Sequence, residues 1–236
     1  MSAKAPIILA VDTSDLELAK SWISHTSEHI SFYKLGLEFF LNFGKEGVRA
    51  VTENSDAKIF LDLKLHDIPN TVAHAATNAA SLNPVFLTVH ASGGAAMVKA
   101  AVDSAPLTHI TAVTILTSMS ESDVKSVGYE KSALQSATNL AQLAVKSGAR
   151  AIVCSPLETA TIRDAIGSET IIITPGVRPV SMAGTDDQTR TMTPSAAIAA
   201  GANYVVIGRP ITNAWEPSGI EIGKRAKEIA AEILNS

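Results

Sequence analysis

Short apolar runs of the kind found in β-strands alternate along this chain with stretches of helical periodicity. The predicted strands are residues 7–12, 32–37, 58–65, 86–90, 110–116, 151–154, 170–174 and 204–207. Residues 16–24 form an amphipathic stretch after the first strand, and the clearest predicted helices are residues 71–80, 134–146 and 221–234. About eight β/α units result, and near-continuous apolar strands such as 171–173 are typical of a parallel sheet covered on both faces. We therefore expect an α/β fold with a single (β/α)8 barrel domain over residues 1–236, and a doubly wound open sheet is the alternative.

The composition is compatible with one such domain and excludes several classes of partner. The chain has 236 residues, 46% hydrophobic and 18% charged, and a barrel of this kind typically needs about 250. A net charge of -4 and a pI near 5.9 provide no basic surface for nucleic acid or an anionic membrane. The single Cys154 cannot form an internal disulfide, and the apolar run 7–11 is too short for a signal peptide or a membrane span. A cytoplasmic location is expected.

Charged and polar side chains recur where the predicted strands end. Asp12 closes the first strand, Lys34 interrupts the second, Asp62 and Lys64 close the third, and His90 closes the fourth. In nearly all characterised (β/α)8 barrels the catalytic groups lie at this carboxyl end of the strands. We expect the active site there.

The third strand separates its apolar and charged residues by parity. Side chains alternate between faces with period two, so the leucines of 60–65 share one face while Asp62 and Lys64 share the other. With the leucines facing the helices, both charges point into the barrel mouth, where an unpaired charge is costly. Asp67, just past the strand, and Lys34, on the neighbouring strand, are candidate partners.

This alternating array has a structural and a functional interpretation. A structural ion-pair network also occurs at barrel mouths and performs no chemistry. Five interleaved charges on three successive strand ends favour function, because apolar packing would serve stability better.

Residues 62–71 read Asp-Leu-Lys-Leu-His-Asp-Ile-Pro-Asn-Thr, which resembles the Asp-x-Lys-x-x-Asp-Ile-Pro-x-Thr signature of orotidine 5′-monophosphate decarboxylases. Asp12 resembles the first-strand aspartate of that family, and Lys34 with Gly36 its second-strand Lys-x-Gly. Segments 89–94, 116–118, 175–179 and 207–210 also resemble family segments, in the family's order. The resemblance spans essentially the whole chain, except for residues 180–187, whose length and composition do not allow an alignment.

The resemblance implies a decarboxylase that works without metal or cofactor. Loss of CO2 from C6 of the pyrimidine leaves a carbanion with no adjacent electron sink, and the chain has neither a nucleotide fingerprint nor a His-Glu-x-x-His metal motif. The family assigns protonation of C6 to Lys64, with Asp62 near the substrate carboxylate. Lys34 would contact the array and the ribose, and Asp12 would also bind the ribose.

The family resemblance also implies a homodimer. Asp67, which is expected to be catalytic, and the substrate-binding residues Ile68 and Thr71 would reach the site of the neighbouring subunit.

The phosphate of the substrate is expected on the other side of the mouth, where the loops after strands seven and eight commonly bind phosphate. Arg178 and Arg209 fall in these loops, and Gly208 allows the backbone to approach an anion. By resemblance Gln188 would reach the phosphate and base, and Thr117 the pyrimidine edge. Residues 180–187 are the candidate lid.

Several residues are interpreted structurally. His66 lacks a second ligand at metal spacing, His90 receives no catalytic role from the resemblance, and Cys154 is expected to be a small buried hydrophobe. Trp22 and Trp215 are expected to serve packing.

Three alternative functions stay open at this point. The first is a related magnesium-dependent barrel that decarboxylates or condenses sugar phosphates, although Lys34 would repel the metal where that branch has a carboxylate. The second is a nucleotide-binding barrel without catalysis. The third is a scaffolding protein, which an apolar surface rather than a charged mouth would indicate.

Overall fold

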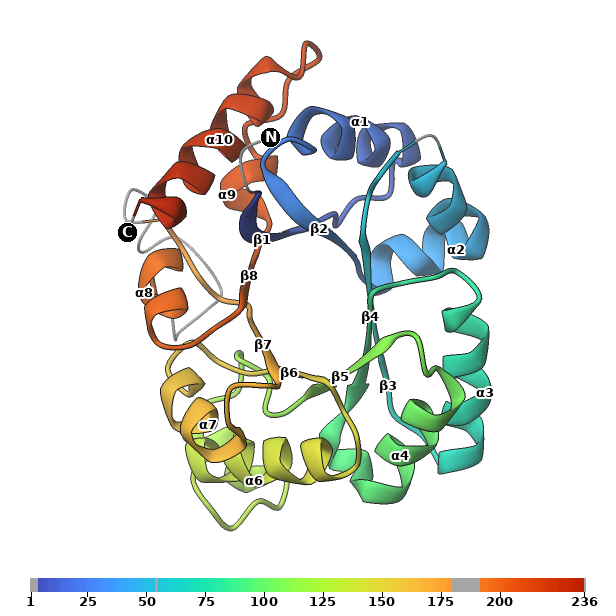
Figure 1. Ribbon diagram of the computed structural model, residues 1–236, viewed down its shortest axis with the longest axis vertical. Coiled ribbons are helices and arrows are strands. Elements are labelled where there is room, and N and C mark those ends of the chain that lie inside the picture. The colour runs from blue at the N-terminus through green and yellow to red at the C-terminus, as the bar shows by residue number, and fades with distance from the viewer. Residues whose placement is uncertain (1–3, 54, 180–191, 236) are drawn as a thin grey trace.

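The computed structural model describes residues 4–53, 55–179 and 192–235, and its strands close into one parallel barrel (Figure 1). The strands follow chain order, and β1 pairs with both β2 and β8. The strands are β1 (Ala5–Ala10), β2 (Ile30–Leu35), β3 (Ile59–Leu65), β4 (Phe86–His90), β5 (His109–Val113), β6 (Ala151–Val153), β7 (Ile171–Thr174) and β8 (Tyr204–Ile207). The predicted (β/α)8 barrel is confirmed, and the open-sheet alternative is wrong because the first and last strands pair.

Helices surround the barrel on its outside (Figure 1). They are α1 (Leu16–Thr26), α2 (Leu37–Thr52), α3 (Pro69–Ala80), α4 (Gly94–Ser104), α5 (Glu121–Ser126), α6 (Ala133–Lys146), α7 (Thr159–Ile166), α8 (Pro194–Ala199), α9 (Arg209–Thr212) and α10 (Ile220–Leu234), with a 3₁₀ turn η1 (Ala91–Gly93) before α4. Their apolar faces and the outward side chains of the strands form the main hydrophobic core. Among the described helices, none combines the length and apolar character needed to cross a membrane.

Element boundaries differ from the predicted ones by a few residues. The predicted strand 110–116 ends at Val113, because its neighbour β6 has only three residues and Val113 pairs with the last of them, Val153. Helix α3 begins at Pro69, two residues before the predicted start, since proline suits the first turn of a helix, where no backbone donor is required.

A second, smaller core fills the barrel interior below the mouth. Phe32, Phe60 and Phe86 meet edge to face there, with ring centroids 5.1 Å apart for Phe32 and Phe86 and 5.6 Å apart for Phe60 and Phe86. Because strand side chains alternate, the next inward residue after each aromatic lies one layer closer to the mouth. On β2 and β3 these next residues are Lys34 and Asp62, so the fold sets the predicted charges on an apolar floor.

Candidate active site

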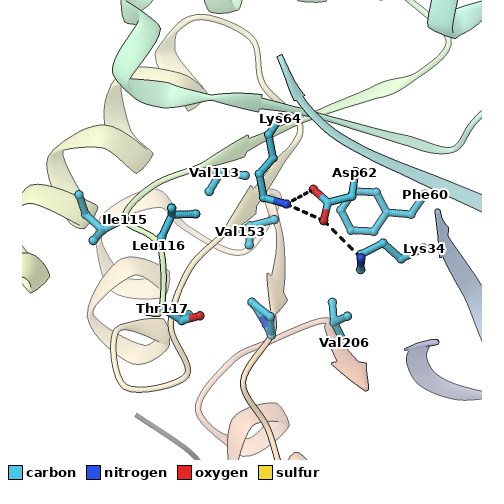
Figure 2. A pocket seen from close by; sticks show the side chains of 11 residues that line it. Lys34, Phe60, Asp62, Lys64, Val113, Ile115, Leu116, Thr117, Val153 and Val206 are labelled. Carbon is cyan, nitrogen blue, oxygen red and sulfur yellow. Dashed lines mark hydrogen bonds and ion pairs between the residues drawn. The ribbon is translucent and has the colours of Figure 1, made fainter. Parts of the chain in front are cut away.

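Four of the five predicted charges form one continuous array at the mouth. Figure 2 shows the ammonium groups of Lys64 and Lys34 on either side of the Asp62 carboxylate. Lys64 Nζ lies 2.8 Å from both Asp62 oxygens, and Lys34 Nζ lies 3.5 Å from Asp62 Oδ2. Lys34 Nζ also lies 3.2 Å from Asp12 Oδ1. The signs alternate along three strand ends, as the parity of the sequence predicts.

The array keeps Asp62 ionised although the residue is buried. Burial is the strongest influence and opposes ionisation, but Lys34, Lys64 and hydrogen bonds from Lys64 and Thr88 outweigh it. The pKa of Asp62 therefore lies below its usual value. A fixed carboxylate with two ammonium partners results, and Lys64, the less buried of the two lysines, is the one that can face a ligand.

The end of β3 departs from regular strand geometry at Lys64. Leu61 pairs with Leu87 and Leu65 with Val89, so four steps on β3 match only two on β4. The two extra residues of β3 are accommodated at Lys64, which has a φ of 49°, a left-handed conformation uncommon for residues other than glycine. Its N–H donates to Thr88 Oγ1 at 2.8 Å, and the Thr88 hydroxyl donates to Asp62 Oδ1 at 3.0 Å.

Thr88 is not among the residues predicted from the sequence, although one signal was available. Phe86, Thr88 and His90 share the parity of β4, and Phe86 faces the barrel interior. A buried hydroxyl one layer above Phe86 could have been placed beside Asp62 by the same period of two.

Gly36 explains the Lys-x-Gly pattern. A Cβ at position 36 would lie 3.0 Å from Lys34 Nζ and 3.2 Å from Asp12 Oδ1. Its absence leaves room for the ion pair between these two side chains.

A cavity of about 180 Å³ opens over the array. Opposite the charges its wall is mainly apolar, and Thr117 contributes a hydroxyl (Figure 2). The apolar lining residues are Phe60, Val113, Ile115, Leu116, Val153, Pro175 and Val206. A charged wall facing an apolar wall suits a planar ring that carries one ionic substituent.

Asp67, Ile68 and Thr71 are not brought into this cavity. Asp67 is exposed, accepts a hydrogen bond from the Ile68 N–H at 2.7 Å, and makes no ion pair with Lys64 in the described chain. Ile68 is 65% exposed, and Thr71 lies exposed in the first turn of α3.

The predicted phosphate residues lie near the ends of β7 and β8. Arg178 is half-buried and donates to the Val177 carbonyl at 2.9 Å, while Arg209 is exposed at the start of α9. A Cβ on Gly208 would lie 3.3 Å from Ala10 Cβ, so this loop passes close to β1. Gln188 and the candidate lid, 180–187, lie outside the described residues.

The residues interpreted structurally are placed as follows. Burial, followed by His66 and Lys64, lowers the pKa of His90, whose ring centroid is 5.4 Å from that of His66. Cys154 is fully buried, and burial raises its pKa to about 12, which agrees with a packing role. Trp22 is buried in the main core and Trp215 packs against it.

The charges of the mouth do not favour a divalent cation. Lys34 Nζ lies between the Asp12 and Asp62 carboxylates, the position from which two oxygens would otherwise approach a metal. Within residues 4–53, 55–179 and 192–235, no group of three His, Cys, Asp or Glu residues is arranged to hold a metal ion.

Comparisons with known proteins identify the family of this chain. The family model described as orotidine 5′-phosphate decarboxylase / HUMPS family matches residues 5–219. The chain is 51% identical over 229 residues to an orotidine 5′-phosphate decarboxylase of Thermobifida fusca (strain YX), covering 97% of this chain and 96% of that protein. It is 43% identical over 245 residues to the protein of the same name from Moorella thermoacetica, covering 99% and 94% of the two chains.

The same name recurs among solved structures. A crystal structure of orotidine 5′-phosphate decarboxylase from Lactobacillus acidophilus superposes with a TM-score of 0.83 at 32% identity, covering 98% of this chain and 99% of that one. With the family model and these relatives matched over nearly the full length, this chain belongs to the orotidine 5′-phosphate decarboxylase / HUMPS family.

Proposed function

We propose that this protein converts orotidine 5′-monophosphate to uridine 5′-monophosphate and CO2, the last step of de novo pyrimidine nucleotide synthesis, in the cytoplasm and without metal or cofactor. The observation that carries the proposal is the Lys64–Asp62 pair, held at 2.8 Å at the end of β3, where both side chains line the cavity. The names of the full-length relatives support the same substrate.

In this proposal Lys64 is the general acid. The bond between C6 and the carboxylate carbon breaks, its electron pair stays on C6, and CO2 leaves. The Lys64 ammonium, already placed by Asp62, stabilises the developing negative charge and then donates a proton to C6. Solvent returns the proton to Lys64, so no electron sink is consumed.

Asp62 serves the transition state better than the ground state. Its ionised carboxylate lies where the substrate carboxylate would approach, and repulsion between them is relieved as CO2 departs. It also fixes the position of Lys64 before substrate arrives, and we treat this preorganisation as the larger contribution.

The remaining substrate contacts are assigned from the family resemblance and, for the described residues, also from their positions. Lys34 and Asp12 would bind the ribose beside the array, and Thr117 would contact the pyrimidine edge across the cavity. Arg178, Gln188, Gly208 and Arg209 would bind the 5′-phosphate through charge-assisted hydrogen bonds. Phosphate binding would orient the base over Lys64.

A homodimer is part of the proposal, with Asp67, Ile68 and Thr71 completing the partner's site. Asp67 and Ile68 are exposed in the single chain and follow the catalytic strand directly. Helix α2 lies beside α3, since Lys45 donates a hydrogen bond to Asn78. On α2 the side chain of Leu37 is 49% exposed and that of Leu41 is 82% exposed. A second copy of the chain would cover this apolar surface.

The substrate and the mechanism are tested together by following orotidine 5′-monophosphate absorbance in excess EDTA. Native protein is expected to form uridine 5′-monophosphate at an undiminished rate, and Lys64→Ala to lose about 10²- to 10⁴-fold in kcat because the general acid is gone. Absence of turnover by folded native protein would contradict the proposed function. Turnover that is lost in EDTA would favour the magnesium-dependent sugar-phosphate enzymes instead.

Sharing of Asp67 between subunits is tested by mixing two inactive variants. Lys64→Ala and Asp67→Ala are each expected to be nearly inactive, while a refolded equimolar mixture should recover up to about one quarter of the native activity. Half of randomly paired dimers are mixed, and each mixed dimer contains one site with both residues intact. If Asp67 serves its own subunit's site, every site in the mixture lacks one residue and no activity returns.

A further inference from the structure

Thr88 connects the two catalytic residues of β3 through a single hydroxyl group. Its Oγ1 accepts the N–H of Lys64 at 2.8 Å and donates to Asp62 Oδ1 at 3.0 Å. The side chain is fully buried on the inner face of β4, one layer above Phe86. A buried hydroxyl with both its donor and its acceptor engaged has a fixed orientation.

The connection occurs at the one point where β3 and β4 lose their register. Lys64 reaches its left-handed φ of 49° between the pairs Leu61 with Leu87 and Leu65 with Val89. A residue in this conformation stays there only if its surroundings hold it, and the free energy it costs is typically about 1–3 kcal/mol. The hydrogen bond from the Lys64 N–H to Thr88 stabilises this left-handed conformation at Lys64 itself.

We infer that Thr88 is a positioning residue, which holds Lys64 in its left-handed conformation and sets the orientation of the Asp62 carboxylate, so that the Lys64 ammonium points at C6. This inference rests on the proposed function for its effect on rate. Thr88 itself touches no substrate, and it acts through Lys64 and Asp62.

The charges facing Asp62 determine what removal of the hydroxyl does to its titration. Lys34 faces it from β2, Lys64 from β3 and His90 from β4, and Asp12 is reached through Lys34. The Thr88 hydrogen bond is one of the influences that lower the pKa of Asp62. Removal of the hydroxyl leaves the charges in place and should raise this pKa.

The test compares three substitutions with the native protein. Thr88→Val replaces the hydroxyl by a methyl group of similar size, and Thr88→Ser keeps the hydroxyl. Thr111→Val is the matched control, because Thr111, on β5, pairs in register with Thr88 on β4 and is equally buried. Its hydroxyl donates to the His109 carbonyl instead of the array.

Thr88→Val is expected to lower kcat for orotidine 5′-monophosphate by about ten- to a hundredfold with little change in KM, because a misplaced catalytic group costs rate. The acid limb of the kcat profile should move to higher pH. Thr88→Ser should restore both, and Thr111→Val should leave both close to native. If Thr88→Val keeps native kcat, or if Thr88→Ser is impaired as much as Thr88→Val, the inference is overturned.

A readout without turnover separates failure of this inference from failure of the proposed function. Amide hydrogen exchange at Lys64 and the NMR titration of the Asp62 carboxylate are measured in the same proteins. In Thr88→Val the amide hydrogen of Lys64 should exchange faster and the pKa of Asp62 should be higher than in the native protein. Thr88→Ser should change neither. Unchanged exchange and titration would overturn the inference even if the native protein proved inactive. If Thr88→Val does not fold, Thr88→Ala takes its place against Thr88→Ser.

Discussion

Asp62 is the residue at which the interactions of the mouth converge. It accepts hydrogen bonds from Lys64 and Thr88, forms ion pairs with both lysines, and is buried on top of the aromatic floor. Its ionised form is therefore favoured in the folded chain relative to the unfolded one, and its influence on stability has a defined sign with pH.

Asp62→Asn is expected to make stability less dependent on acid. The folded-state pKa of Asp62 is lowered, so its contribution is complete above the ordinary aspartate value and is lost as the pH falls through the folded value. The unfolding free energy of the native protein should thus decline more steeply than that of Asp62→Asn between about pH 5 and about pH 2. Urea denaturation at several pH values measures both slopes.

The control for this comparison is Asp164→Asn, which removes an exposed carboxylate on α7. Its slope should follow that of the native protein. Equal slopes for the native protein and Asp62→Asn would contradict the linkage. At neutral pH Asp62→Asn should also be less stable than native, because Lys34 and Lys64 lose their shared partner.

The elements around the mouth are held by local signals that are independent of the charges. Helix α5 follows the Thr117 loop and begins with a capping box, in which Ser120 accepts from the Asp123 N–H and Asp123 accepts from the Ser120 N–H. Such a box satisfies two backbone donors that the first turn leaves unpaired. It fixes where the loop ends and the helix begins.

Ser120→Ala is expected to lower the unfolding free energy by about 1 kcal/mol, because the side-chain acceptor at the start of α5 is lost. Chemical denaturation measures the change. Ser122→Ala is the matched control, since Ser122 contacts Ser120 by its hydroxyl but does not cap the helix. Its effect should stay within about 0.5 kcal/mol, and an equal loss in both variants would refute the capping role.

At the scale of the whole molecule, the barrel interior joins strands that are far apart in the chain. Phe86 on β4 meets Phe32 on β2, Phe60 on β3 and Tyr204 on β8 through edge contacts. This layer lies directly beneath the charged array, so the closure of the barrel and the position of the site depend on the same packing.

Phe86→Ala is expected to destabilise the protein by about 3–5 kcal/mol, because a large void cannot collapse where strands surround it on all sides. Urea denaturation should show a single cooperative transition shifted to lower urea. Leu107→Ala, at a side chain 93% exposed, should change stability by less than about 0.5 kcal/mol. A small loss for Phe86→Ala would mean that the interior tolerates the void and is not tightly packed.

Much of the fold and of the array could be predicted because both depend on short-range periodicity. The alternation of apolar strands and amphipathic helices can be recognised from consecutive residues. The inward direction of Asp62 and Lys64 follows because they alternate with the leucines of β3. The family resemblance then assigned roles that periodicity alone could not.

The tertiary structure decided what depends on the register between strands. The sequence does not show that β3 carries two more residues than β4 at its end, so neither the left-handed Lys64 nor its contact with Thr88 could be predicted. The apolar wall opposite the array was also unforeseen, because it combines residues from β5, β6, β8 and the loops after β5 and β7. Periodicity sets which way each side chain points, but only the closed barrel sets which side chains meet.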